Sequence, residues 1–330
     1  MTSHPLDVVA VGSAIVDVLT TTDDADIDAR GLVKGTMALV DAERADALYE
    51  SMGPAVEVSG GSAANTVAGV ASFGASAAFI GKVRDDQLGE VFTHDIRAGG
   101  VEFTTPPAAD GPSTARCLVM VTPDAQRTMC TYLGAATGLA PADIDAGVIG
   151  RARYTYLEGY LWDPPEAIEA LRRSVALAHD AGRQVALSLS DPFCVDRHRK
   201  AFLDFIASDV DVLFANEAEI TSLFEVAALD DALDLLPGHC DVAAVTRGPL
   251  GSIVVTADGR VEMPAEPVER VVDTTGAGDL YAAGFLYGLA TGADPARCAR
   301  LGGIAAAEVI AHIGARPRVP LSSLVAALDA

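Results

Sequence analysis

Short apolar runs alternate with helical patterns through the second half of the chain, and this rhythm restricts the fold more than any other feature. The apolar runs cover 154–157, 184–190, 210–215 and 241–246, with helical patterns at 164–181 and 196–208 between them. Helices of this length allow the chain to cross from one parallel strand to the next. We therefore predict an α/β fold of three layers, α/β/α, in which helices cover both faces of a mainly parallel central sheet.

The first part of the chain does not follow this rhythm and indicates a second, smaller sheet. Two β-rich runs, 113–121 and 127–133, are typical of an antiparallel hairpin. Met37–Val40 is a short strand pattern within an otherwise irregular, acid-rich stretch. We predict a single domain across all 330 residues, with a small β-sheet lid formed by about 18–57 and 112–134.

The charge balance limits the kinds of partner that this chain can bind. With 23 basic and 46 acidic residues, the formal net charge of −23 argues against nucleic acid and against anionic membranes. No run approaches the roughly 20 apolar residues of a membrane span. The 5 cysteines lack a Cys-x-x-Cys spacing and are expected to be reduced, so we predict a cytoplasmic protein. A phosphorylated ligand would need local positive groups or Mg²⁺.

A strand, a glycine turn and a small-residue helix follow one another over Val271–Phe285. Gly276 and Gly278 leave backbone N–H groups unshielded at the start of the helix, where an anion can bind. Asp279 would repel that anion, but it is well placed to take a proton from a hydroxyl that attacks it. An acidic residue in a first helical turn also simply complements the helix dipole, so both interpretations stay open here.

Polar residues follow several other predicted strands or begin a helix. Asp17 comes shortly after the first strand and Glu158 directly after a later one, where ligands of open α/β sheets gather. Gly60 and Gly61 precede an alanine-rich helix that carries Asn65 near its start. Each of these residues could contact a sugar hydroxyl, and each could equally serve a turn or a flexible loop.

Two further segments are candidates for nucleotide contacts. Asn216 and Glu219 have the spacing of a helix capping box, and they could also act near Mg²⁺ or its water ligands. Thr246, Gly248 and Gly251 form a turn after a strand that could approach a nucleotide.

The order of these motifs is more specific than any one of them. It runs Gly60-Gly61-x-x-x-Asn65, Asn216-x-x-Glu219, Thr246-x-Gly248-x-x-Gly251 and Asp273-Thr274-x-Gly276-Ala277-Gly278-Asp279. This order resembles the ribokinase-like (PfkB) carbohydrate and nucleoside kinases, from about Asp7 to Pro317. The last motif, together with the diglycine segment, is specific to that family.

The resemblance implies a role for each matching position. Asp279 would be the general base, with Gly276, Ala277 and Gly278 as the anion hole for the transferring phosphoryl group. The substrate hydroxyls would meet Ser13, Asp17, Gly60, Gly61 and Asn65. ATP would lie along Thr246, Gly248, Gly251 and Gly278, with its adenine near Gly303 and Ala306. Asn216 and Glu219 would organise Mg²⁺ through water, and Asp273 and Thr275 would supply ligands to the monovalent cation, such as K⁺, that many relatives use.

Two positions depart from the pattern that the family shows. Arg84 stands where a glycine is expected, and Ser13 stands where many relatives have Asn. The chain also lacks the Gly-x-x-x-x-Gly-Lys-Ser/Thr motif, so its nucleotide site is not of the Walker type.

The lid indicates the substrate branch. The segments 111–117, 127–129 and 132–136 resemble the adenosine kinase branch, in which the residue matching Arg127 contacts phosphate. Without that resemblance, Arg127 could also be a solvated surface residue. Seven residues could form an apolar wall for a purine base or could simply pack the lid: Met37, Leu39, Cys117, Met120, Leu133, Tyr160 and Trp162.

We predict an ATP-dependent kinase that phosphorylates the 5′-hydroxyl of a purine ribonucleoside, namely adenosine, guanosine or inosine. The alternative is a kinase of ribose or a ketohexose, which Glu158 would favour because it suits a polyol. Two other classes are a nucleoside- or sugar-binding regulatory protein and a nicotinamide dehydrogenase. The intact Asp279 argues against the first, and the absence of Gly-x-Gly-x-x-Gly after the first strand argues against the second. The exposed lid edge allows a monomer or a lid-mediated homodimer.

Overall fold

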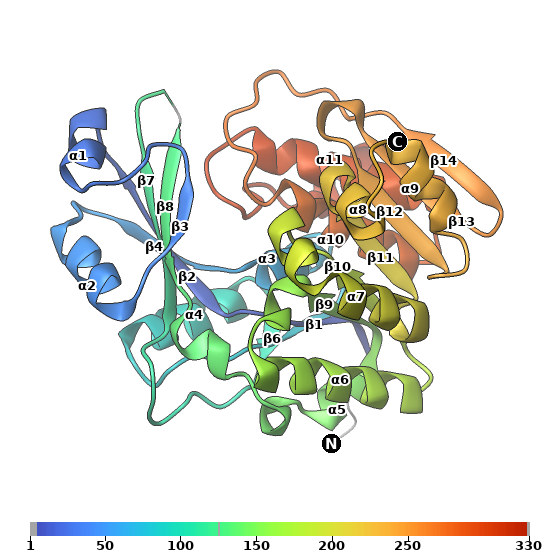
Figure 1. Ribbon diagram of the computed structural model, residues 1–330, viewed down its shortest axis with the longest axis horizontal. Coiled ribbons are helices and arrows are strands. Elements are labelled where there is room, and N and C mark those ends of the chain that lie inside the picture. Colours follow the sequence, from blue (N-terminus) through green and yellow to red (C-terminus); the bar gives the residue numbers. More distant parts are fainter. Residues whose placement is uncertain (1–4, 125, 329–330) are drawn as a thin grey trace.

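The computed structural model describes residues 5–124 and 126–328, and two β-sheets organise them (Figure 1). The strands of the central sheet are, in spatial order, β14 (Gly259–Met263), β13 (Ser252–Thr256), β12 (Val242–Thr246), β11 (Val212–Asn216), β10 (Gln184–Ser188), β9 (Ala152–Glu158), β1 (Leu6–Val11), β5 (Ala77–Ile80) and β6 (Val101–Phe103). Only the pairs β12–β13 and β13–β14 are antiparallel. The predicted α/β fold with a mainly parallel central sheet is confirmed.

Helices cover both faces of the central sheet. One face carries α3 (Ser62–Ser72), α4 (Gln87–Ala98), α10 (Ala277–Ala290), α11 (Pro295–Ile310) and α12 (Leu321–Leu328). The other face carries α5 (Ala146–Arg151), α6 (Pro165–Asp180), α7 (Pro192–Asp209), α8 (Glu217–Phe224) and α9 (Leu229–Leu235). Short 3₁₀ helices lie at Gly134–Gly138, Pro141–Asp143, Gly159–Trp162 and Gly248–Leu250. None of these helices has both the length and the apolar character needed to cross a bilayer, within the described residues.

The strands separate two apolar cores because successive side chains point to opposite faces. In β1, Val8 and Ala10 belong to the core under α3 and α10, whereas Val9 and Val11 belong to the core under α5 and α6. Both cores are built mainly from aliphatic side chains, as the low aromatic content of 5% requires. The helices are thus fixed on both sides of one rigid sheet.

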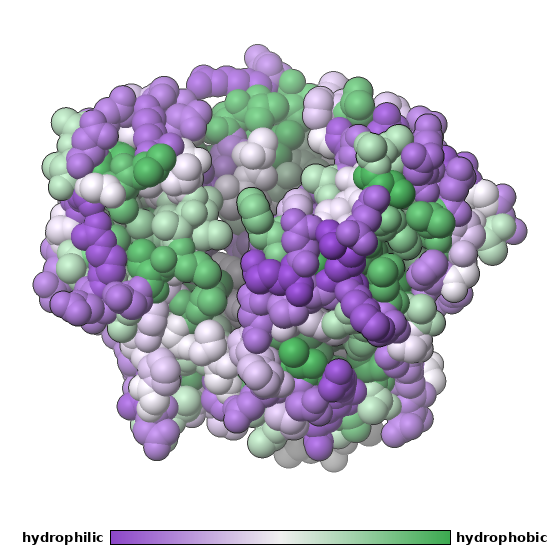
Figure 2. Space-filling view, in the orientation of Figure 1, coloured by the Kyte–Doolittle hydropathy of each residue, from purple (hydrophilic) through white to green (hydrophobic). Residues whose placement is uncertain are grey.

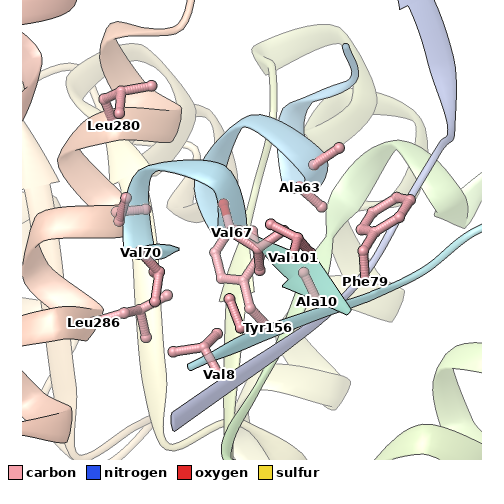
Figure 3. Packing of buried hydrophobic residues seen from close by; sticks show 14 of the residues in the cluster. Val8, Ala10, Ala63, Val67, Val70, Phe79, Val101, Tyr156, Leu280 and Leu286 are labelled. Carbon is pink, nitrogen blue, oxygen red and sulfur yellow. The ribbon is translucent and has the colours of Figure 1, made fainter. Parts of the chain in front are cut away.

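Close packing of α3 against α10 brings the starts of these two helices together. Figure 3 shows Val67 and Val70 of α3 among Val8, Tyr156 and Leu286, with α10 running alongside. A Cβ atom on Gly69 would lie 2.6 Å from the Cβ of Ala283, so the glycine permits this approach. The glycine turn before α10 therefore lies beside the first turn of α3.

The second sheet, here called the lid sheet, projects from one side of the body formed by the central sheet and its helices (Figure 1). Its strands are, in order, β3 (Met37–Leu39), β8 (Arg127–Tyr132), β7 (Ala115–Val121), β2 (Ile15–Thr21) and β4 (Val56–Gly60). The antiparallel pairing of β7 with β8 confirms the predicted hairpin, and its turn includes residue 125, which lies outside the described residues.

Alternation along β7 separates the two faces of the lid sheet. Cys117, Val119 and Val121 form one small apolar cluster, against which Ile313 of the body packs. Leu118 and Met120 point the other way and join the main core. One face of the lid sheet is therefore turned toward the body.

The stretch from Thr20 to Met52 was predicted to be irregular apart from one strand, and this prediction was wrong. It contains two helices, α1 (Asp24–Ala29) and α2 (Ala42–Ser51), which bury Ile27 and Leu48 against the lid sheet. Both helices begin with an aspartate that accepts a hydrogen bond from a first-turn N–H. The acid-rich sequence concealed them because α1 buries only Ile27 and α2 only Ala45 and Leu48, which gives no clear periodicity.

Candidate active site

A cavity of about 970 Å³ lies between the lid sheet and the ends of β1, β9, β10, β11 and β12. Figure 2 shows the hollow on this face, between the lid on the left and the body on the right. The predicted site residues that line it are Ser13, Asp17, Gly61, Asn65, Arg127, Glu158, Asn216, Glu219, Thr246, Thr275, Gly276, Ala277, Gly278 and Asp279. The fold brings these residues together, and their chemical roles stay predictions.

The start of α10 has the geometry of an anion site. Gly276 is the N-cap, with φ of 77°, and no side chain caps the helix. A Cβ atom at Gly276 would lie 2.7 Å from the Cβ of Ala315, so both the backbone conformation and the space require glycine. Nothing lies within 4 Å of the position that a Cβ of Gly278 would occupy. Of the first N–H groups, that of Ala277 donates to the carbonyl oxygen of Thr274 at 3.2 Å, and no described side chain caps the helix start, where an anion can bind.

Asp279 is held by two side chains from α3. Ser62 Oγ donates to Asp279 Oδ1 at 2.6 Å, and Asn65 Nδ2 donates to Oδ2 at 2.9 Å. Burial raises the pKa of Asp279, and these hydrogen bonds oppose the rise. A raised pKa makes the carboxylate a better proton acceptor. Sequence reasoning missed Ser62, although it directly follows the predicted diglycine.

A buried arginine that sequence reasoning missed lies behind this carboxylate. Arg316 donates to the carbonyl oxygen of Ser59 at 2.8 and 3.0 Å and to that of Ala64 at 2.8 Å. Burial lowers the pKa of Arg316 to about 10, which leaves it charged at neutral pH. Its positive charge opposes the rise that burial causes in the pKa values of Asp279 and Asp17. No local motif marks Arg316 in the sequence.

Asp17 in β2 faces the cavity as a free hydrogen-bond acceptor. No described residue donates a hydrogen bond to its carboxylate, and burial raises its pKa to about 6. Gly60 of β4, predicted to contact substrate, does not line the cavity. A side chain at Gly60 would clash with the Asp17 carboxylate, so this glycine makes room for Asp17.

Glu158 is completely buried and its carboxylate is already occupied. Its Oε1 accepts the N–H of Ser13 at 2.8 Å, and its Oε2 accepts the N–H of Ala63 at 3.0 Å. Glu158 thereby ties the loop after β1 to the first turn of α3. Burial raises the pKa of Glu158, and the hydrogen bonds that it accepts counteract this rise.

Arg127 of the lid sheet pairs with Asp273 of the body. The guanidinium Nη1 lies 2.5 Å from Asp273 Oδ2, and the two side chains are 8% and 3% exposed. The carboxylate also accepts the N–H groups of Thr275, at 3.0 Å, and Gly314, at 2.9 Å. Burial would raise the pKa of Asp273, but the bonds from Arg127 and these N–H groups outweigh it and hold the pKa below its ordinary value. Arg127 is therefore not a solvated surface residue.

Asn216 and Glu219 form the predicted capping box at the start of α8. Asn216 Oδ1 accepts the N–H of Glu219 at 2.9 Å, and Glu219 Oε2 accepts the N–H of Asn216 at 2.9 Å. Burial raises the pKa of Glu219 to about 7, and the nearby Asp191 adds to the rise. Glu219 and Asp191 both line the cavity, and neither carboxylate has a basic partner among the described residues. A cation would relieve the repulsion between these two carboxylates, so Glu219 and Asp191 fit Mg²⁺ held through water.

Several predicted nucleotide positions lie outside the cavity lining. They are Gly248 and Gly251 in the turn after β12, and Gly303 and Ala306 on α11. Asp273 also lies behind the lining, because it is buried under Arg127. The nucleotide roles of these glycines and of Ala306 stay predictions.

The predicted apolar wall needs correction at two positions. Met37, Leu39, Cys117, Leu133 and Tyr160 do line the cavity. Met120 faces the opposite side of the lid sheet, and Trp162 packs between Phe202 and Phe205 beneath α7. Both are core residues, in keeping with the packing alternative.

Phe193, in the first turn of α7, lines the cavity although sequence reasoning missed it, and its side chain is 76% exposed. A single phenylalanine in a helical pattern offers no sequence signal for such exposure.

Comparisons with known proteins agree with this geometry. Residues 7–321 match the family described as pfkB family carbohydrate kinase. The structure of adenosine kinase from Sinorhizobium meliloti is 51% identical, with a TM-score of 0.91 over 98% of this chain and 99% of that chain. A probable sugar kinase from Rhizobium etli CFN 42 is 47% identical, with a TM-score of 0.92 over 99% of both chains.

A more distant relative extends the range of acceptors named within the family. The ATP-dependent ribose-1-phosphate kinase of Halopiger xanaduensis is 30% identical over 86% of this chain and 92% of its own length. All three relatives are named as kinases of small molecules that carry hydroxyl groups. This chain therefore belongs to the pfkB family of carbohydrate kinases and is a phosphotransferase that acts on a hydroxyl group.

Proposed function

We propose that the protein transfers the γ-phosphoryl group of ATP to the 5′-hydroxyl of a purine ribonucleoside, with Asp279 as the general base. The observation that carries the choice of a nucleoside is the apolar lining of the cavity. Met37, Leu39 and Phe193 are 53%, 64% and 76% exposed, although each is large and apolar. A purine ring would cover such side chains, whereas a free sugar offers hydroxyl groups that prefer polar partners.

The acceptor would be oriented by groups that have no hydrogen-bond partner among the described residues. The Asp17 carboxylate is free to accept hydrogen bonds from ribose hydroxyls. Asn65 Oδ1 is buried and has no hydrogen-bond partner within residues 5–124 and 126–328, while its Nδ2 donates to Asp279. Buried polar atoms are normally paired, so an unpaired acceptor at this position supports a bound hydroxyl.

Transfer would then depend on positioning and on charge stabilisation. Asp279 accepts the proton of the attacking hydroxyl, and the N–H groups from Gly276 to Gly278 stabilise the phosphoryl oxygens. Glu219 and Asp191 would hold Mg²⁺ through water, because both carboxylates line the cavity and repel one another. Bound Mg²⁺ would neutralise part of the phosphate charge.

A sugar kinase is the competing function, because two similar proteins are named as kinases of sugars or sugar phosphates. Glu158, which lines the cavity, supports it less than its place after a strand suggested. The carboxylate that was expected to bind a polyol is engaged by the N–H groups of Ser13 and Ala63. A substrate panel separates the two functions.

The test is ADP formation from ATP and Mg²⁺ with adenosine, guanosine, inosine, ribose, fructose or ribose-1-phosphate as acceptor. We expect turnover with at least one nucleoside. In Phe193→Ser the KM for that nucleoside should rise by about 10-fold or more, since the transfer free energy of such a side chain is roughly 1.5–3 kcal/mol.

The control is Val56→Ser, which removes another exposed apolar side chain, at 63%, that does not line the cavity. Its KM should not change. Turnover with a sugar alone, or an unchanged nucleoside KM in Phe193→Ser, would contradict the assignment of the base pocket.

A further inference from the structure

The buried ion pair between Arg127 and Asp273 connects the lid sheet to the body at the edge of the anion hole. Arg127 begins β8 of the lid sheet, and Asp273 begins the loop that leads to Gly276. The two residues are 146 positions apart in the sequence. The Asp273 carboxylate binds both the Arg127 guanidinium and the N–H of Thr275, which precedes Gly276, so the guanidinium lies close to where the phosphoryl group would bind.

We propose that Asp273 is a positioning residue whose carboxylate holds Arg127 beside the anion hole, and that the guanidinium takes the place of a monovalent cation there. This inference rests on the proposed function, because it assigns Arg127 to the charge of the transferring phosphoryl group. It departs from the expectation that Asp273 would be a ligand of K⁺.

The contacts of Asp273 show why a second cation does not fit while the pair is intact. Three donors already engage its two oxygens, namely the N–H groups of Thr275 and Gly314 and the Arg127 guanidinium. A K⁺ ion at this carboxylate would have to displace Arg127 or lie against another positive charge. With both partners buried, such repulsion would be weakly screened.

The guanidinium keeps a free donor for a ligand. Arg127 Nε is buried and has no hydrogen-bond partner among the described residues. Since Nη1 is used by Asp273, the same side chain can bind the carboxylate and still donate to a phosphoryl oxygen. Asp273 would thus fix the orientation of an arginine that the lid sheet contributes to the cavity.

The first test is a double-mutant cycle with Arg127→Ala, Asp273→Asn and the double variant, assayed with the acceptor that the substrate panel identifies. Arg127→Ala should lower kcat by about 10²–10³, the usual effect of removing one donor from an anion hole. Asp273→Asn should also lower kcat, and the double variant should be no slower than Arg127→Ala. Independent, multiplying losses would overturn the proposal.

The control variant is Asp143→Asn, which breaks another part-buried ion pair, with Lys82 at 2.8 Å, away from the cavity lining. It should leave kcat unchanged even if it lowers the melting temperature. A kcat loss in Asp143→Asn as large as that in Asp273→Asn would mean that the loss at Asp273 reflects general destabilisation.

The second test needs no turnover and so remains informative if no acceptor is found. Melting temperatures are compared in KCl and in choline chloride at equal ionic strength. The wild type should show no K⁺-specific shift, whereas Arg127→Ala should gain one of about 2 °C or more, because the freed carboxylate can then take the ion. The double variant should lose this gain.

A K⁺-specific stabilisation of the wild type that disappears in Asp273→Asn would overturn the proposal and support a cation site instead. Failure of the whole substrate panel would count against the proposed function alone. The two failures are therefore distinguishable.

Discussion

Asp279→Asn is the substitution for which the structure specifies the surroundings most completely. The carboxylate accepts one hydrogen bond from Ser62 and one from Asn65, and both donors come from the first turns of α3. An asparagine has the same shape and cannot accept a proton at neutral pH. The amide of Asn65 can rotate to present Oδ1, which has no partner in the wild type, to the new NH₂ group. The local hydrogen bonds can therefore be remade.

The expected loss of turnover follows from the role of a general base. Such groups contribute about 10²–10⁴ to the rate, which corresponds to roughly 3–5 kcal/mol of transition-state free energy. Stability should not fall, because burial disfavours the charged form of Asp279, as its raised pKa indicates, and the neutral amide avoids this cost. ATP affinity should be unchanged or slightly higher, since a negative charge beside the anion hole is removed.

The assay combines kcat for the identified acceptor, ATP affinity by calorimetry and the melting temperature of each protein. Asp279→Glu serves as the companion variant, since it keeps the base but displaces it by one methylene. We expect Asp279→Asn to be the slower of the two. If Asp279→Asn retained wild-type turnover, Asp279 would have no part in proton transfer; if it failed to fold, the compensation through Asn65 would be wrong.

Three further substitutions test other parts of the account. Burial raises the pKa of Asp17 to about 6, so the folded protein binds this proton more tightly than the unfolded chain and loses stability as pH rises from about 4 to 6. Asp17→Asn should flatten that part of the stability profile in urea unfolding, and an unaltered profile would contradict the burial of Asp17. Glu158→Gln puts an NH₂ donor in place of one of the two oxygens that accept backbone N–H groups, and it should lower the free energy of unfolding by roughly 1–3 kcal/mol in the same assay. No loss would mean that other contacts hold the loop after β1 against the first turn of α3. Gly276→Ala forces a Cβ against Ala315 at a φ of 77° and should abolish turnover, whereas an active variant would show that this turn is not the anion hole.

The sequence predicts those parts of the site that depend on local spacing. Asn216 and Glu219 are three residues apart, and their capping box forms as expected. The glycine turn before α10 and the placement of Asp279 in its first turn likewise follow from adjacent residues. Local hydrogen bonding decides these features, so a short motif carries enough information.

Contacts between distant segments could not be predicted in this way. Arg316 binds Ser59 across 257 positions, and Arg127 binds Asp273 across 146. Only the packing of α3 against α10 and the position of the lid sheet bring these partners together. The binding of Glu158 to backbone N–H groups is another tertiary contact that its place after a strand does not predict, and its contact with substrate stays a prediction.

The two helices that pack on the lid sheet, α1 and α2, show that the fold, too, could be predicted only in part from local sequence. In α1 the only buried residue is Ile27, and the surrounding aspartates give the segment the composition of a loop. Its capping by Asp23 and its packing against the lid sheet stabilise a helix that periodicity does not reveal.

The most direct test of the central claim is to incubate the protein with ATP, Mg²⁺ and a single acceptor, adenosine or ribose, and to identify the phosphorylated product by ³¹P NMR. The account predicts that adenosine yields ADP and adenosine 5′-monophosphate in equal amounts and that ribose yields no product. If the base pocket prefers an oxopurine, guanosine or inosine is the nucleoside that is phosphorylated in place of adenosine. Phosphorylation of ribose with no reaction of any purine nucleoside would contradict it.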